Sequence, residues 1–195
     1  MSWDLPSPFI HQRVAHHAEI DGYGHVNNVV YVAWMDDCAW AHSIERGIPP
    51  EMCRDLGRGM AVWRTQVHYL GSAYEGDRIQ VATWPVLNDG RLRIERRFQV
   101  RRESDGATLV RALVHYVCID LVTGKARRMP EEFRKYTVSP EVAAAPIKRS
   151  FCIISTSRLM TLGSPSSASD LAAALRTYSG CFGSSISRRR LLCPA

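Results

Sequence analysis

One helical pattern near the N-terminal end constrains the fold more than any other feature of the chain. Apolar and small residues recur there at three- and four-residue steps, which is the spacing that a buried helix requires. The positions are Val30, Tyr31, Trp34, Cys38, Ala41 and Ile44. Either Asn27 or Asn28 can cap its start, and Gly47 followed by Pro49-Pro50 predicts its end. A helix that is apolar on most sides has to be covered by the rest of the fold.

Four strand-like stretches follow this helix and predict the sheet that covers it. Residues alternate between apolar and polar along them, and turn residues such as Asn88-Asp89-Gly90 separate them. The stretches are 61–70, 77–87, 91–102 and 109–119. An extended segment, 10–20, precedes the helix, and a short helix is predicted from Pro130 to about Tyr136. The order predicts an α+β fold, with a curved antiparallel sheet wrapped around one long central helix.

The composition changes near residue 140. Before it, apolar and charged residues alternate, and after it serine-, alanine- and arginine-rich segments follow. We therefore divide the chain into a domain, 1–140, and a tail, 141–195, which we expect to be disordered or loosely attached. The net charge is +6, and the tail, with seven basic and two acidic residues, carries +5 of it. A domain of charge +1 gives little support for binding of nucleic acid.

Other features of the sequence bear on location and on disulfides. No stretch approaches the roughly 18 apolar residues of a membrane span, and the first 13 residues lack a basic region followed by an apolar block. We therefore expect a cytoplasmic protein that does not bind a membrane. The six cysteines form no C-x-x-C pair, so we expect free thiols and neither a zinc nor a redox motif.

The segment before the predicted helix carries the residues with the most chemistry. A carboxylate, an imidazole and two amides surround a glycine turn there: Asp21, His25, Asn27 and Asn28. A helix start offers unpaired N–H groups and the positive end of a dipole, which can polarise a carbonyl oxygen. A carboxylate upstream can attack that carbonyl or take a proton from water. These residues fit an acyl-transfer site, although a capped helix after a turn is the simpler interpretation of the residues alone.

A resemblance to a known family favours the catalytic interpretation. The stretch D-G-Y-G-H-V-N-N-V-V-Y, Asp21 to Tyr31, resembles the active-site segment of hotdog-fold acyl-CoA thioesterases. These form the 4-hydroxybenzoyl-CoA thioesterase-like superfamily, and the similarity is to its FadM-like, long-chain-acyl branch. The part H-V-N-N-x-x-Y also resembles plant acyl-ACP thioesterases. The stretches V-C-I-D-L-V-T-G-K-A and P-E-E-F-R-K look like the last strand and C-terminal helix of the same branch, so the resemblance covers about residues 8–138.

The resemblance implies a role for each residue of the motif. Asp21 matches the catalytic aspartate, as nucleophile or as general base, and these two roles stay open. Asn28 matches the residue whose backbone N–H polarises the thioester carbonyl. His25 and Asn27 match positions that shape the pocket and have catalytic parts in the acyl-ACP relatives, and Tyr31 is expected to contact substrate. Family members pair their sheets, which implies a homodimer or homotetramer with active sites at the subunit interface. No cofactor is expected.

Three further residues are candidates for substrate contacts. The arginines of the predicted strand 91–102 are Arg91, Arg93, Arg96, Arg97, Arg101 and Arg102. They fit a solvated outer face, but Arg91 and Arg93, beside the hairpin turn, are also placed to bind the phosphates of CoA. Trp34, Trp40, Trp63 and Trp84 fit either core packing or an acyl channel. Among them, Trp63 is the preferred channel residue because its strand is expected to face the acyl chain of a partner.

The expected activity is hydrolysis of an acyl-CoA, with length and class of the acyl group left open. A metal site is not expected: among His11, His16, His17 and His25, the adjacent pair points to opposite sides of an extended segment. Three other functions remain open on the sequence, and a fourth is disfavoured. The protein can bind acyl-CoA or acyl-carrier protein without hydrolysis, act on acyl-ACP, or bind a partner through its arginine-rich tail. A hotdog dehydratase or hydratase is disfavoured because its different histidine and carboxylate motif is absent from the sequence.

Overall fold

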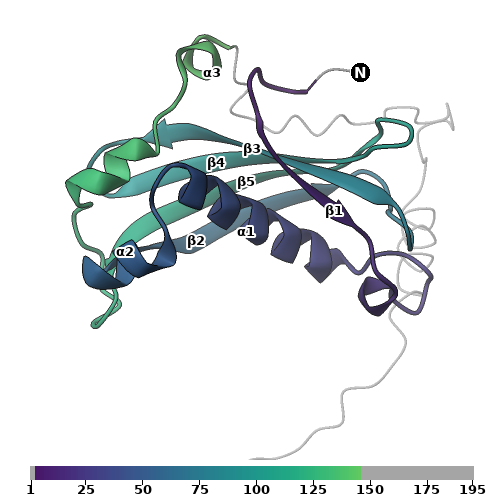
Figure 1. Ribbon diagram of the computed structural model, residues 1–195, viewed down its shortest axis with the longest axis horizontal. Coiled ribbons are helices and arrows are strands. Elements are labelled where there is room, and N and C mark those ends of the chain that lie inside the picture. The colour runs from purple at the N-terminus through teal and green to yellow at the C-terminus, as the bar shows by residue number, and fades with distance from the viewer. Residues whose placement is uncertain (1–2, 146–195) are drawn as a thin grey trace, which may run out of the picture. The chain divides into compact units, whose positions relative to one another are not determined.

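The computed structural model describes residues 3–145 of the chain (Figure 1). The elements are β1 (Phe9–Val14), the 3₁₀ helix η1 (His17–Glu19), α1 (Asn28–Glu45), α2 (Pro50–Asp55), β2 (Arg58–Tyr69), β3 (Arg78–Asn88), β4 (Arg93–Arg102), β5 (Thr108–Asp120), the 3₁₀ helix η2 (Glu131–Lys135) and α3 (Pro140–Ala144). All strands pair antiparallel in one sheet of order β1-β3-β4-β5-β2. The long helix α1 lies along the concave face of this sheet (Figure 1). The predicted α+β architecture is confirmed.

The helix α1 begins and ends where the sequence predicts. Asn27 is its cap, because its side-chain oxygen accepts a hydrogen bond from the Val29 N–H at 3.0 Å. Gly47 follows its end with φ of 71° in the left-handed region, where glycine is favoured. The two prolines do more than end α1, because Pro50 occupies the first turn of α2, a helix that the sequence analysis did not predict.

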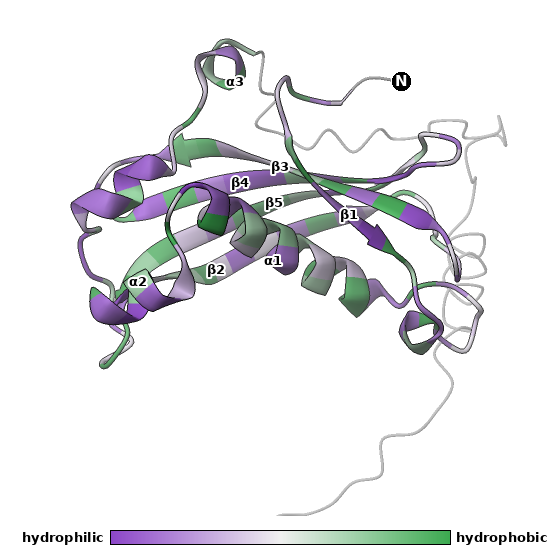
Figure 2. Cartoon of the chain, in the orientation of Figure 1, coloured by the Kyte–Doolittle hydropathy of each residue, from purple (hydrophilic) through white to green (hydrophobic). Residues whose placement is uncertain are grey.

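The core lies between α1 and the sheet. Trp34, Met35 and Cys38 of α1 are buried against strand residues such as Val81 and Phe98. Hydrophobic and hydrophilic residues alternate along the strands in Figure 2, as expected for a sheet with one face on a core. Cys53 and Cys118 are buried like Cys38, and all three are free thiols. The other three cysteines lie outside the described residues.

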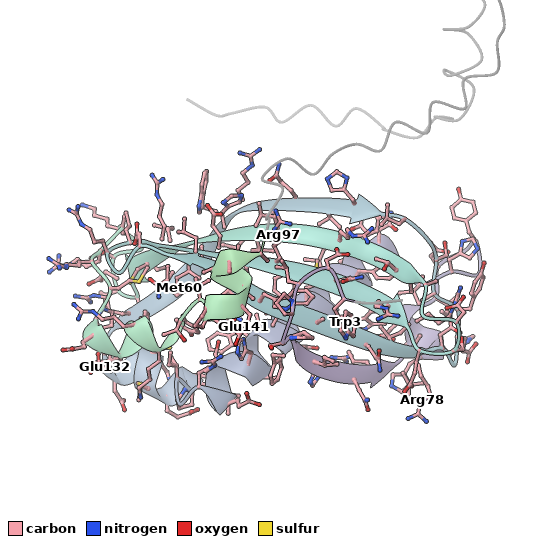
Figure 3. The ribbon with its side chains drawn as sticks, turned by 90° about the horizontal axis from the view of Figure 1, so that it is seen from above. Trp3, Met60, Arg78, Arg97, Glu132 and Glu141 are labelled. Carbon is pink, nitrogen blue, oxygen red and sulfur yellow. The ribbon has the colours of Figure 1, made fainter. Side chains whose placement is uncertain are left out.

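The opposite face of the sheet is covered by the N-terminal segment and α3. Trp3 lies over the guanidinium of Arg101, at 4.6 Å from it to the ring centre, and Asp4 forms an ion pair with Arg111. Trp3 and Arg97 are labelled in Figure 3. Val142 of α3 is buried with Leu5 and Trp84. Regular structure thus continues to residue 144, just past the predicted domain boundary at 140, and residues 146–195 of the predicted tail lie outside the described residues.

The arginines of β4 do not all lie on this outer face, contrary to the simpler expectation. Arg96 shares the inward side of the strand with Ile94 and Phe98, and only 3% of it is exposed. Side chains alternate along a strand, so Arg97 and Arg101 point outward as expected. Within residues 3–145, no helix is long and apolar enough to cross a membrane.

Candidate active site

The motif of the sequence forms a tight turn before α1. Ile20 and Val26 pair as an isolated antiparallel bridge, and the Asp21 N–H donates to the carbonyl oxygen of His25 at 2.7 Å. The side chain of Asp21 closes this turn, since its Oδ1 accepts from the N–H groups of Tyr23 at 2.9 Å and His25 at 3.3 Å. Gly24 permits the turn because its φ is 79°. Within residues 3–145, the hydrogen bonds of this half-buried carboxylate all go to Oδ1, which leaves Oδ2 available.

The start of α1 presents one unused backbone donor beside this turn. The N–H of Val29 is taken by the side chain of Asn27, and the N–H of Val30 donates to the carbonyl oxygen of Asn27. The Asn28 N–H is the donor that remains in this first turn of the described helix, at the positive end of the helix dipole. This is the atom to which the resemblance assigns the polarisation of a thioester carbonyl.

Several core contacts hold the turn and the helix start together. The Val26 N–H donates to the carbonyl oxygen of Ala73 at 2.9 Å, and the Ala73 N–H donates to the Tyr31 hydroxyl at 2.8 Å. The Tyr69 hydroxyl donates to the carbonyl oxygen of Asn28 at 3.0 Å. Tyr31 is buried by these contacts, with 1% exposed, so in this chain it holds the site in place from within the core. Its contact with substrate stays a prediction.

Glu19 is a supporting residue that the sequence analysis missed. Its Oε1 accepts from the indole N–H of Trp34 at 2.9 Å, and its Oε2 accepts from the backbone N–H of His16 at 2.8 Å. Its backbone oxygen accepts from the Asn27 N–H at 2.9 Å. Glu19 thus joins η1, the core of α1 and the cap of α1. It lies two residues before the motif, but nothing in the sequence shows that Trp34 is its partner.

His25 stands beside Asp21 with its ring half buried. The ring contacts that of Tyr74 edge to face, with 5.1 Å between centres. Within residues 3–145, no hydrogen bond is formed by either ring nitrogen of His25, so both remain available to a substrate or to water. Asp21, His25, Asn27 and Asn28 therefore lie on one turn and one helix start, as the sequence predicts.

The other predicted substrate contacts are not brought to this turn within one chain. The turn lies near the start of β3, because the Val26 N–H donates to the carbonyl oxygen of Ala73, which is five residues before Arg78. Arg91 and Arg93 follow the end of β3, so they lie about 30 Å away by the rise of a strand. Both are exposed.

Trp63 points away from α1 within its own chain, and its contact with the acyl chain of a partner stays a prediction. Its ring contacts His115, with 5.6 Å between ring centres, and His115 points to the face of the sheet opposite α1. The register of β2 against β5 shifts between Val62 and Arg64, and this bulge turns Trp63 outward while Val62 faces α1. Trp34 and Trp84 are core residues, and Trp40 is 40% exposed beside the groove described next.

An apolar groove runs between α1 and β2 from the helix start. Its first part holds about 430 Å³ of free space, and its walls include Val29, Val32, Val62 and Tyr116. A second, smaller hollow of about 70 Å³ continues along α1 as far as Ser43 and shares Val62 and Tyr116 with the first. The groove begins at Val29, next to the Asn28 N–H, so an acyl group whose carbonyl lies at the helix start can extend into it.

Among the described residues, no three histidine, cysteine, aspartate or glutamate side chains come together in a group that could hold a metal.

The sequence model of the thioesterase-like superfamily matches residues 15–136. No curated protein matches the chain.

Solved structures give further matches, all at low sequence identity. Slr0204 from Synechocystis, a 1,4-dihydroxy-2-naphthoyl-CoA thioesterase, is 18% identical over 67% of this chain and 95% of its own, with a TM-score of 0.61. SAV2348 from Staphylococcus aureus, solved in complex with CoA, is 18% identical over 75% and 98%, with a TM-score of 0.62. YbaW from Escherichia coli, described as a probable thioesterase, is 22% identical over 66% and 95%, with a TM-score of 0.55. These likenesses confirm the hotdog fold.

Proposed function

The chain belongs to the thioesterase-like superfamily, and on this premise we propose that it hydrolyses acyl-CoA thioesters to a free acid and CoA. One observation carries the proposal: the Asp21 carboxylate keeps Oδ2 available beside the helix start whose Asn28 N–H is unused. Family membership supports hydrolysis of thioesters in general. The neighbour that was solved with CoA supports CoA as the thiol part of the substrate.

The chemistry follows from these two atoms. The thioester oxygen accepts a hydrogen bond from the Asn28 N–H, which stabilises the negative charge that develops as the carbonyl carbon is attacked. Asp21 Oδ2 either attacks that carbon itself, forming an anhydride that water then opens, or takes a proton from the attacking water. In the first route water attacks the acyl carbonyl of the anhydride, and the bond between that carbon and Asp21 Oδ2 breaks, which restores the carboxylate. In both routes the oxygen of water then ends in the acid, and the thiolate of CoA leaves and is protonated.

The acyl group occupies the groove along α1. From Asn28 to Ser43 the helix rises about 22 Å, which is the length available to the acyl group. The apolar walls and this length support a long-chain substrate, as in the FadM-like branch that the motif resembles. His25, beside Asp21 and with both ring nitrogens available within the described residues, is assigned a contact with the substrate.

A homodimer is part of the proposal. Within the described residues, the 12-residue strand β2 pairs with β5 alone and forms one edge of the sheet. A long edge with exposed apolar side chains, such as Val62 at 51% exposed, favours pairing with a second chain. Arg91 and Arg93 lie a strand length from their own Asp21, so we assign their contact with CoA phosphates to a site on another subunit.

The experiment is steady-state release of free thiol from short, long and aromatic acyl-CoAs, with the matching acyl-carrier-protein thioesters beside them. The proposal predicts turnover of at least one CoA thioester, and the best substrate then identifies the acyl class. Turnover of the carrier-protein thioesters alone would favour the acyl-ACP alternative. Tight binding of acyl-CoA with no release of thiol would overturn the proposal in favour of a binding protein.

A further inference from the structure

The inner end of the groove contains a charged residue that the proposed hydrolysis does not use. Arg96 stands on the inward side of β4 between Ile94 and Phe98, where the neighbouring strand residues are apolar, and it is 3% exposed. Together with Ser43, Tyr116 and Tyr136, it lines the smaller hollow of the groove. A methionine or leucine would fill such a position at no electrostatic cost.

Among residues 3–145, the contacts that Arg96 makes are with neutral groups. One terminal nitrogen is 2.9 Å from His42 Nδ1, the other is 3.5 Å from Ser43 Oγ, and the guanidinium lies over the Tyr136 ring at 5.1 Å from its centre. Burial lowers the pKa of His42 to about 3, and Arg96 adds to this effect, so His42 is neutral at physiological pH. Within residues 3–145, Arg96 forms no ion pair.

The nearest acid in the groove does not supply a counter-charge. Asp36 lines both hollows, but it is exposed on α1 and makes no ion pair with Arg96. A buried guanidinium without a carboxylate or phosphate partner is unfavourable, because its hydration is lost and nothing of opposite charge replaces it. Tyr116 adds a second polar group, since its hydroxyl forms no hydrogen bond within the described residues and faces the same hollow.

We propose that Arg96 binds a carboxylate at the far end of the acyl group, so that the preferred substrates are acyl thioesters that carry a second, distal carboxylate. The inference rests on the proposed function and specifies its substrate class. Arginine binds carboxylates with two parallel hydrogen bonds, and such charge-assisted bonds are strong where water is excluded. The anion supplies the charge that the hollow lacks, and Tyr116 is placed to donate to it.

The position of Arg96 sets the length of the substrate. It adjoins Ala39 and Ser43 of α1, which are 11 and 15 residues after Asn28, or about 16 to 22 Å along the helix. An extended chain gains roughly 1.2 Å per bond, from the 3.6 Å that the three backbone bonds of a residue span. The acyl chain between thioester and carboxylate is therefore about 13 to 18 bonds long.

The test compares three CoA thioesters of equal chain length: hexadecanedioyl-CoA, its distal methyl ester and hexadecanoyl-CoA. Affinity is measured by calorimetry and turnover by thiol release. The dicarboxylic thioester should bind and react about tenfold or more better than its methyl ester, because only the free carboxylate pairs with Arg96. Equal affinities for the acid and the ester would overturn the inference, whether or not thiol is released. Selective binding without release would leave the inference standing and overturn the proposed hydrolysis.

Two variants test whether Arg96 causes the preference for the dicarboxylic thioester. Arg96→Met keeps an unbranched apolar side chain, although a shorter one, and removes the charge, and it should abolish the preference for the dicarboxylic thioester while leaving hexadecanoyl-CoA bound. Arg97→Met, the next residue on the opposite face of β4, should keep the preference. A preference that survives in Arg96→Met would contradict the inference. If Arg96→Met fails to fold, the comparison of acid and ester on the wild type decides the question.

Discussion

Replacement of Tyr31 by phenylalanine tests how the core holds the site. The Tyr31 hydroxyl accepts the N–H of Ala73, and both residues are buried, with 1% and 0% exposed. Tyr31→Phe leaves this N–H without an acceptor, which costs about 1 to 3 kcal/mol, while the ring keeps its contacts with Trp34 and Tyr69. In a chain of this length, 2 kcal/mol lowers the melting temperature by about 4 to 8 °C.

The assay is thermal and urea unfolding followed by circular dichroism, with Tyr74→Phe as the control. Tyr74 follows Ala73 and is 48% exposed, so its variant should stay within about 0.5 kcal/mol of the wild type. Stability of Tyr31→Phe equal to that of the control would refute the reasoning, because another group would then satisfy the Ala73 N–H. A raised KM at unchanged stability would instead support the contact of Tyr31 with substrate.

Three further predictions concern the turn and the buried histidine. Asn27→Ala removes the acceptor for the Val29 N–H and should cost about 1 kcal/mol in urea unfolding. Gly24→Ala should cost about 1 to 2 kcal/mol in the same assay through strain at its positive φ, since an added Cβ meets no atom within 4 Å. Burial and Arg96 lower the pKa of His42 from 6.5 to about 3, so the unfolded chain binds a proton first as the pH falls. The free energy of unfolding should therefore fall as the pH drops from 6.5 toward 3, by at most about 1.4 kcal/mol per pH unit. His42→Gln should make the free energy of unfolding less dependent on pH in this range.

The fold was predictable where local patterns decide it. The three- and four-residue spacing predicted α1, and strict alternation predicted β2 to β5 to within three residues of their observed ends. The helix α2 was missed because Pro49-Pro50 was taken only as a stop, although proline is also favoured in a first helical turn.

The candidate site was predictable in part. Asp21, His25, Asn27 and Asn28 are close in sequence, so a local motif was sufficient to bring them together. Sheet order places Arg91 a strand length from this turn, and a bulge turns Trp63 outward, and neither feature can be read from a single sequence. The contacts of both residues with substrate stay predictions.

Arg96 is a different case, because its inward orientation was readable from the sequence. Arg96 is an even number of residues from Ile94 and Phe98, so its side chain lies on the same side of β4 as theirs. It was grouped with the outward arginines because charged side chains normally lie in solvent. A charged residue in phase with the apolar side of a strand is the signal that would have identified it.

The measurement that tests the central claim most directly is the turnover of the best thioester substrate by Asp21→Asn. Asparagine keeps an oxygen that accepts from the N–H groups of Tyr23 and His25, so the turn is retained while the charge is removed. The control is Asp89→Asn, since Asp89 also closes a turn, by accepting from the N–H groups of residues 91–93, but lies at the other end of the sheet.

The account predicts that Asp21→Asn lowers kcat by a hundredfold or more, about 3 kcal/mol of barrier, while Asp89→Asn remains close to the wild type. An Asp21→Asn variant that turns over thioester within a few fold of the wild-type rate would contradict it, because Asp21 would then only close its turn.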